Sequence, residues 1–151
     1  MKTRFLALAM IVISITACGR KGREKEKEEA APSEIAVLEK NHEAHPTDTS
    51  ALKELGRAYA KAGKIDAAIQ LSFELQEALK DSSYILSLYE RGMFEAELYR
   101  IAGDEESAEM ALEDARIFIN RQGWGELSES DKALMEECLE HIAAASVPPG
   151  D

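Results

Sequence analysis

Histidine and carboxylate side chains near position 45 are the first residues whose spacing could support chemistry. His42 and His45 lie three residues apart and precede Asp48, so one helix end could offer two imidazoles and a carboxylate to a metal ion. Histidines at the C-terminal end of a helix also interact favourably with its dipole, and this needs no metal. We favour this second interpretation and predict neither a metal site nor a bound cofactor.

Cys138 is the second candidate, because His141 lies three residues further along the same predicted helix. A thiol nucleophile needs an activating base and a further group that orients the base, and no orienting group accompanies this pair. The place of Cys138 in the apolar pattern instead predicts a small buried side chain. Glu136 and Glu140 are one carboxylate pair among many, which a solvated face explains. We therefore predict no catalytic residue and a protein that is not an enzyme.

Charge is unevenly distributed along the chain. Seven of the 18 Lys/Arg residues but four of the 29 Asp/Glu residues lie in residues 1–29, so residues 30–151 hold 11 basic and 25 acidic residues, a net charge of −14. An acidic body repels phosphate groups, which excludes nucleic-acid binding as a function class. The sequence also contains no P-loop, dinucleotide-binding glycine motif, zinc-protease helix or paired CxxC. We expect no nucleic-acid partner and no small-molecule substrate.

Lys53, Arg57 and Lys61 form the one basic cluster that stands out in this acidic body. Their spacing of four residues places them on one side of a predicted helix, as a basic ridge. Two interpretations remain open. The basic ridge is either a solvent-exposed stripe paired with neighbouring glutamates or part of a peptide-binding surface.

The first eighteen residues have the organisation of a secretory leader. Lys2 and Arg4 give a positive start, and residues 5–17 are uncharged and largely apolar, whereas a membrane-spanning helix needs ~20 such residues. The letters ITAC at positions 15–18 resemble the lipobox of bacterial lipoproteins, with isoleucine in place of the usual leucine. The resemblance implies a signal peptide over residues 1–17 and lipid attachment to Cys18.

The lipobox resemblance also implies a location. Acyl chains on Cys18 would hold the protein at a membrane. In a bacterium with two membranes, Gly19 favours the periplasmic face of the outer membrane, because it is not the aspartate associated with inner-membrane retention. In other bacteria we expect the outer face of the cell membrane. Residues 18–32 are charged and almost without apolar side chains, which predicts a flexible tether, and residues 147–151 predict a disordered tail.

The sequence predicts an all-α domain over residues 33–146. Apolar residues recur at intervals of three and four, and no stretch alternates as a half-buried strand would. Gly63 and Gly103 lie where helices should end, and Ser128 with Asp131 resembles a capping box. Trp124 is expected to close the end of the core. The predicted helices are 33–44, 49–62, 65–80, 83–102, 104–121 and 129–145.

Two stretches of the chain are similar at an offset of 40 residues. Each contains a small residue, a tyrosine three residues later, a glycine at a predicted helix end and an alanine five residues beyond it. The superposed positions are Leu55, Gly56, Tyr59, Gly63 and Ala68 in the first copy and Glu95, Ala96, Tyr99, Gly103 and Ala108 in the second.

This pattern resembles the tetratricopeptide repeat, a helix-turn-helix unit with small residues where its helices cross and an aromatic residue beside them. Leu38 and Pro46 match the second half of a repeat upstream. The resemblance implies about six antiparallel helices in a short right-handed superhelix, with repeats at about 49–82 and 89–122 and flanking helices 33–44 and 129–145 as lids.

The chain departs from the repeat motif at several positions. Leu52 stands where tryptophan is usual, Ser72 where the second helix has an aromatic residue, and Glu95 where leucine is usual. The offset of 40 also exceeds the usual repeat length of about 34 residues. Gly92 lies inside a predicted helix, at a cost of about 1 kcal/mol relative to alanine unless it permits a kink or close packing.

The repeat resemblance implies a protein-binding module. In this family the first helix of each repeat lines a concave groove, and Lys53 and Arg57 occupy positions resembling those that bind peptide carboxylates in some members. We expect a membrane-anchored adaptor, and the alternative is a structural or assembly-accessory subunit of an envelope complex, such as pilus or outer-membrane machinery, that uses its end faces. The candidate groove residues are Lys53, Arg57, Lys61, Met93, Glu97 and Arg100.

Overall fold

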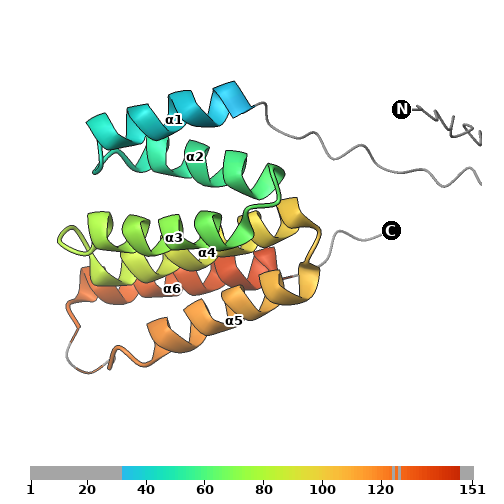
Figure 1. Cartoon of the computed structure of the whole chain (residues 1–151). Helices are drawn as coiled ribbons and strands as arrows, with labels where there is room; N and C mark the ends of the chain where they lie inside the picture. Colours follow the sequence, from blue (N-terminus) through green and yellow to red (C-terminus); the bar gives the residue numbers. More distant parts are fainter. Residues whose placement is uncertain (1–31, 124, 126, 147–151) are drawn as a thin grey trace, which may run out of the picture.

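Six α-helices joined by short turns make up the described part of the chain (Figure 1). The structure is a computed structural model that describes residues 32–123, 125 and 127–146. Every helix begins and ends within one residue of its predicted bounds, so the all-α prediction is confirmed. The helices are α1 (Pro32–Ala44), α2 (Thr49–Lys61), α3 (Ile65–Leu79), α4 (Tyr84–Ala102), α5 (Glu105–Asn120) and α6 (Glu129–Ala145).

Several predicted features lie outside the described residues. They are the signal peptide at 1–17, the lipidated Cys18, the tether up to residue 31, Trp124 and the tail at 147–151. Residue 32, predicted as the end of the tether, is instead the first residue of α1. A proline suits this position, because the first turn of a helix needs no N–H donor from it. None of the described helices has the length and apolar character needed to span a membrane.

Polar side chains begin four of the helices. Asp48 accepts hydrogen bonds from the backbone of Ser50 and Ala51 at the start of α2. Ser83, Asp104 and Ser128 cap α4, α5 and α6 in the same manner. These oxygens satisfy N–H groups that lack a partner inside the helix. The predicted capping of α6 by Ser128 is therefore confirmed.

Two helices, α2 and α4, end at the predicted glycines with the same backbone geometry. Gly63 and Gly103 have φ angles of 76° and 81°, a region that glycine adopts without steric cost. The backbone N–H of the residue after each glycine donates a hydrogen bond of 2.9 Å to the carbonyl of Tyr59 or Tyr99. The N–H of each glycine donates one of 3.0 Å to the carbonyl three residues before it. This is the Schellman arrangement, and it occurs twice at the predicted offset.

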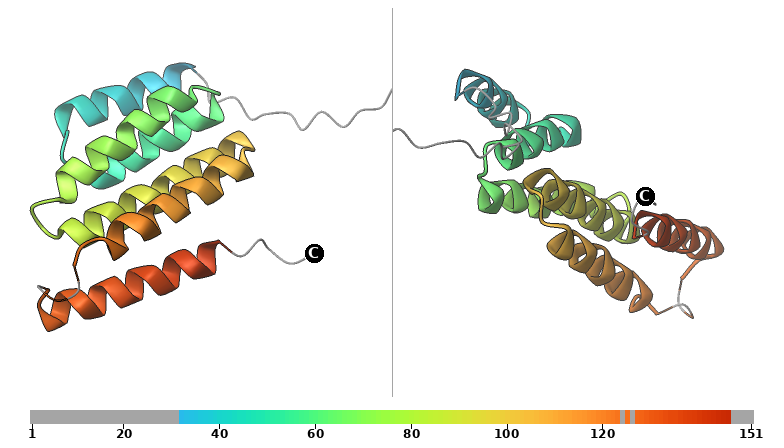
Figure 2. Two further views of the ribbon diagram at one scale, coloured as in Figure 1. Left: turned by 90° about the horizontal axis from the view of Figure 1, so that it is seen from below. Right: turned by 90° about the vertical axis from the view of Figure 1, so that its right-hand side faces the viewer.

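Helices that are adjacent in the sequence pack against each other in an antiparallel manner, from α1 at one end to α6 at the other (Figure 2). In addition, α2 contacts α4, and α4 contacts α6. Within the described residues, no backbone contact joins α1, α3 and α5 to one another. The even-numbered helices therefore lie in succession, with α4 in the middle.

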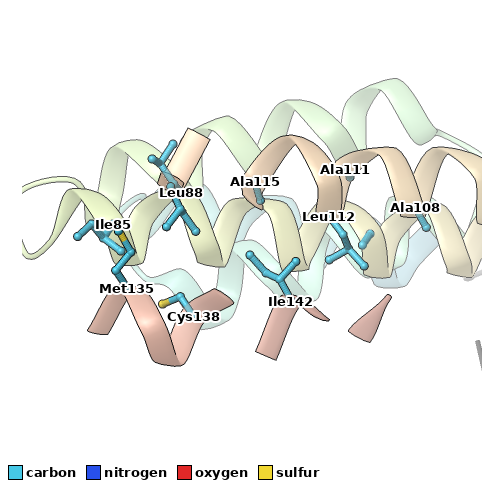
Figure 3. Close-up of a cluster of buried hydrophobic side chains, with 11 residues drawn as sticks. Ile85, Leu88, Ala108, Ala111, Leu112, Ala115, Met135, Cys138 and Ile142 are labelled. Atoms are coloured by element: carbon cyan, nitrogen blue, oxygen red, sulfur yellow. The ribbon is translucent and has the colours of Figure 1, made fainter. Parts of the chain in front are cut away.

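The apolar core consists of two clusters that share α4. The first lies among α1, α2, α3 and α4 and includes Ile35, Leu52 and Leu98. The second lies among α4, α5 and α6, where Leu112 and Ile142 are fully buried (Figure 3). Because α1 packs on the first cluster and α6 on the second, these two helices cover the ends of the core.

Gly56 and Gly92 lie where neighbouring helices leave no room for a Cβ atom. A Cβ atom on Gly56 would lie 2.6 Å from the ring of Phe94, so α2 and α4 meet there. A Cβ atom on Gly92 would lie 2.3 Å from the Cβ of Ala115 and 3.3 Å from the carbonyl oxygen of Ala111. The glycine inside α4 is thus explained by close packing against α5.

Two of the departures from the repeat motif are bonded to each other. The fully buried Ser72 donates to Glu95 Oε1 over 2.6 Å. Arg91 Nε donates to the same oxygen over 2.8 Å, and its guanidinium lies 3.9 Å from the centre of the Phe73 ring. The side chain of Glu95 is only 12% exposed, so these donors satisfy a largely buried carboxylate. A polar pair between α3 and α4 replaces the apolar residues of the motif.

Tyr59 binds α2 to α1 through a hydrogen bond of 2.6 Å from its hydroxyl to Glu39. This bond, with burial and the charge of Glu39, raises the pKa of Tyr59 to about 12. A raised folded-state pKa gives stability that is complete below the unfolded value of about 10 and is lost as the pH rises through about 12. Folding should therefore weaken in this alkaline window.

We expect the Tyr59→Phe variant to lack this alkaline transition. Phenolate absorbance, followed against pH for wild type and variant, gives a difference curve that belongs to Tyr59 alone. A midpoint of the difference curve near 12 is the expected result. A midpoint near 10, the value of a free tyrosine, would contradict the bond to Glu39.

Candidate functional site

A hollow of about 540 Å³ lies between α2 and α4. Its apolar side chains come from α4, where Phe94 is buried and Met93 and Ile101 are half-buried. Charged side chains from both helices complete the lining. Apolar surface therefore stays accessible inside a charged rim. The lining residues are Lys53, Glu90, Met93, Phe94, Glu97, Arg100 and Ile101.

Four of the six predicted groove residues line this hollow, namely Lys53, Met93, Glu97 and Arg100. Arg57 lies beside them, because it is bonded to Glu97. Lys61 does not line the hollow and is exposed in the last turn of α2. Five of the six residues chosen from the two sequence copies therefore lie at or beside the same hollow in the structure.

Three lining residues were not among the predicted ones. Glu90, Phe94 and Ile101 follow one another at intervals of four and seven residues, and so share the side of α4 that carries Glu97. Helical periodicity around Glu97 would have identified them. The repeat resemblance alone gives the positions of α4 that match the first copy, and it does not give the residues on the neighbouring turns of α4.

Both cations of the basic ridge that lie at the hollow are paired with glutamates of α4. Lys53 Nζ lies 2.6 Å from Glu90 Oε2. Arg57 makes two bonds to Glu97, from Nε over 2.6 Å and from Nη2 over 3.1 Å. The hydrogen bond to Glu97 is the main cause that raises the pKa of Arg57. Two of the three cations of the basic ridge, Lys53 and Arg57, are therefore neutralised by glutamates of α4.

Arg100 fixes the far end of the rim. Its Nε donates to Glu105 over 2.9 Å, and its Nη2 donates to the carbonyl oxygen of Ala145 over 3.0 Å. That carbonyl belongs to the last turn of α6, where the C=O groups have no hydrogen-bond partner inside their own helix. Arg100 thus joins α4 to the end of α6 as well as lining the hollow.

The structure does not assemble the residues considered for a metal site. His42 Nε2 lies 3.0 Å from Glu74 Oε2 of α3, and Asp48 is engaged in capping α2. His45 is exposed. Within the residues that the structure describes, no group of three or more side chains has the geometry of a metal site. The imidazole of His42 and the carboxylate of Asp48 therefore have separate structural roles.

Cys138 is part of the second apolar cluster (Figure 3). Burial is the main cause that raises its pKa to about 11, and the charges of Glu137 and Glu90 add to it. His141 directs Nδ1 to the hydroxyl of Tyr89 at 3.3 Å. A thiol that stays protonated and buried is a poor nucleophile, so the predicted role as a small buried side chain is confirmed.

The residues that carry the repeat resemblance have matching environments in the two copies. Comparison of the chain with protein-family models, with curated proteins and with solved structures finds no match. The resemblance therefore rests on the residues and their arrangement. Buried members are Leu52, Leu55, Gly56, Ala68, Ala96 and Ala108; Tyr59 and Tyr99 are half-buried; Gly63 and Gly103 are exposed at helix ends.

Proposed function

We propose that this chain is a membrane-anchored protein-interaction module of the tetratricopeptide-repeat type, and that it binds a partner protein at the hollow between α2 and α4. The observation that carries the proposal is the hollow itself. Accessible apolar side chains inside a rim of fixed polar groups are the usual composition of a binding site. Met93 is one of the two half-buried apolar residues of this site.

Three observations support the repeat assignment. Gly63 and Gly103 end α2 and α4 with the same hydrogen bonds at an offset of 40 residues. The even-numbered helices lie in succession, as the first helices of successive repeats do in this family. The bond between Ser72 and Glu95 accounts for two departures from the motif together. A right-handed superhelix with α2 and α4 on its concave side is the architecture we propose.

Membrane anchoring is proposed from the lipobox at residues 15–18. Lipid on Cys18 and the tether that follows would hold the helical domain at the periplasmic face of the outer membrane, or at the outer face of the cell membrane in a bacterium with one membrane. A binding module at that place recruits or positions other envelope proteins and needs no catalytic group. We therefore propose that the chain is not an enzyme.

The second candidate function is a structural or assembly-accessory subunit that acts through its end faces. One observation favours it, since Val37 on α1 is 66% exposed at the end of the helix array. Burial of this side chain would favour a contact with another protein at that end. Substitution of Val37 therefore separates this function from binding at the hollow.

Three single substitutions test the proposed function on the tagged full chain, expressed in its own host and purified in detergent. Met93→Glu places a charge in the hollow. Met110→Glu is the matched control, because Met110 is 58% exposed on α5 outside the hollow. Val37→Glu tests the end face. Circular dichroism shows which variants keep the helical fold.

We expect a co-purifying partner that is retained by Met110→Glu and Val37→Glu and lost by Met93→Glu. A partner retained by Met93→Glu and lost by Val37→Glu would replace the proposed function with the end-face alternative. Charge reversal at Lys53 or Arg57 is a weaker test, since it would oppose like charges across the α2–α4 contact and loosen the packing.

A further inference from the structure

The rim of the hollow carries no unmatched charge in the part of the chain that the structure describes. Lys53 is paired with Glu90, Arg57 with Glu97, and Arg100 with Glu105. Each pair joins one cation to one carboxylate, so the three pairs together are neutral. A partner segment that enters the hollow therefore meets accessible apolar surface and already paired charges.

An acidic segment gains little from these cations. To reach Arg57, a ligand carboxylate has to displace Glu97, which accepts two hydrogen bonds from the guanidinium. The displaced glutamate then stays close to the ligand carboxylate, and the two negative charges repel each other. The body of the protein also has a net charge of −14 over residues 30–151. Both effects oppose the binding of an anion.

A basic segment is attracted by the net charge of the body, but at the rim it meets the same pairing with the opposite sign. Glu90 and Glu97 are already bonded to Lys53 and Arg57, which would remain close to an incoming cation. What the protein leaves unpaired inside the rim is the apolar surface of the half-buried Met93 and Ile101, which lie beside the buried Phe94. Burial of that surface is the favourable contribution still open to a ligand.

We propose, on the basis of the proposed function, that the hollow selects an uncharged segment of a partner protein with bulky apolar side chains. From Glu90 to Ile101 the lining spans 12 residues of α4, and the 11 steps between the first and the last correspond to about 16 Å at the rise of an α-helix. The segment presents its apolar side chains along that length. Two of the ion pairs, Lys53 with Glu90 and Arg57 with Glu97, join α2 to α4, and all three pairs of the rim exclude charged competitors.

Methionine methyl resonances give a direct test on the full chain. Met93 reports on the hollow, Met110 on an exposed surface of α5, and Met135 on the buried core. The probes are three pools of capped peptides with leucine and phenylalanine at the centre. Their flanking residues are serine in one pool, aspartate in the second and lysine in the third.

The expected result is a concentration-dependent shift of the Met93 methyl resonance with the serine-flanked pool. Met110 and Met135 stay in place, and the two charged pools bind at least about fivefold more weakly. Affinity for the serine-flanked pool stays within about twofold when salt is raised to about 0.5 M, because apolar burial is not screened.

Glu97→Gln tests whether the ion pair is the reason for this selectivity. The substitution frees the guanidinium of Arg57, so the aspartate-flanked pool should gain affinity by about tenfold and lose it again at high salt. Glu113→Gln is the matched control, since Glu113 pairs with Arg116 on α5, outside the hollow. This control should leave all three affinities unchanged.

Three outcomes would overturn the inference. The first is tightest binding of the aspartate-flanked pool to the wild type, which leaves the proposed function intact and makes the hollow an anion site. The second is an equal response to all pools, or a response at Met110 instead of Met93. The third is no response of Met93 to any pool; the proposed function is then decided separately, by whether Met93→Glu loses the partner that co-purifies with the wild type.

Discussion

The Leu98→Ala variant is expected to unfold with a free energy about 3 kcal/mol below that of the wild type. Leu98 is fully buried in α4 and belongs to the cluster that joins α1, α2, α3 and α4. Truncation removes buried apolar surface and leaves a cavity that rigid helices on several sides cannot fill. Urea unfolding followed by circular dichroism measures the difference.

Val37→Ala is the matched control for this prediction. It also shortens an aliphatic side chain in a helix, but Val37 is 66% exposed, so the expected change is below about 0.5 kcal/mol. Equal losses for the two variants would contradict the placement of Leu98 in the core. If Leu98→Ala lowers the free energy of unfolding and leaves its slope against urea concentration unchanged, the folded variant buries as much surface as the wild type.

The Gly92→Ala variant is expected to lose about 2 kcal/mol. In an exposed helix the same substitution would stabilise by about 1 kcal/mol, because alanine is the better helix former. At this position the new Cβ would lie 2.3 Å from the Cβ of Ala115, and the backbone carbonyl of Ala111 is also close. The sign of the change therefore reports directly on the approach of α4 to α5.

Exchange of the two small residues provides the control. The double variant Gly92→Ala with Ala115→Gly removes the clash and keeps one alanine and one glycine in the two helices. We expect its free energy of unfolding to return to within about 1 kcal/mol of the wild type, as a coupled pair in contact should. A Gly92→Ala protein at least as stable as the wild type would contradict the close packing.

Most of the fold could be predicted from local signals. Helix ends depend on residues that are adjacent in the sequence. The sequence alone therefore predicts Gly63 and Gly103 as helix ends and Ser128 as a helix cap, without knowledge of the packing. The apolar periodicity gave all helix bounds to within one residue. The role of His42 could not be predicted from local signals, because its partner Glu74 lies 32 residues away on another helix. A metal site therefore remained an open interpretation in the sequence.

The candidate site could be predicted only in part. The offset of 40 residues placed Lys53 and Arg57 near the helix that carries Met93 and Glu97. It did not give the pairing, because Lys53 with Glu90 and Arg57 with Glu97 depend on how α2 and α4 lie against each other. The sequence therefore located a basic ridge, and the structure shows two of its three cations, Lys53 and Arg57, paired with glutamates.

The order in which the helices pack also determines how this chain folds. In the described part of the chain, backbone contacts join only helices that are one or two positions apart. Chains rich in local contacts fold in microseconds to milliseconds, and linear arrays can nucleate at any unit. If the protein is exported as we propose, α2 and α3 can pack on each other before α6 has crossed the membrane, so folding keeps pace with translocation.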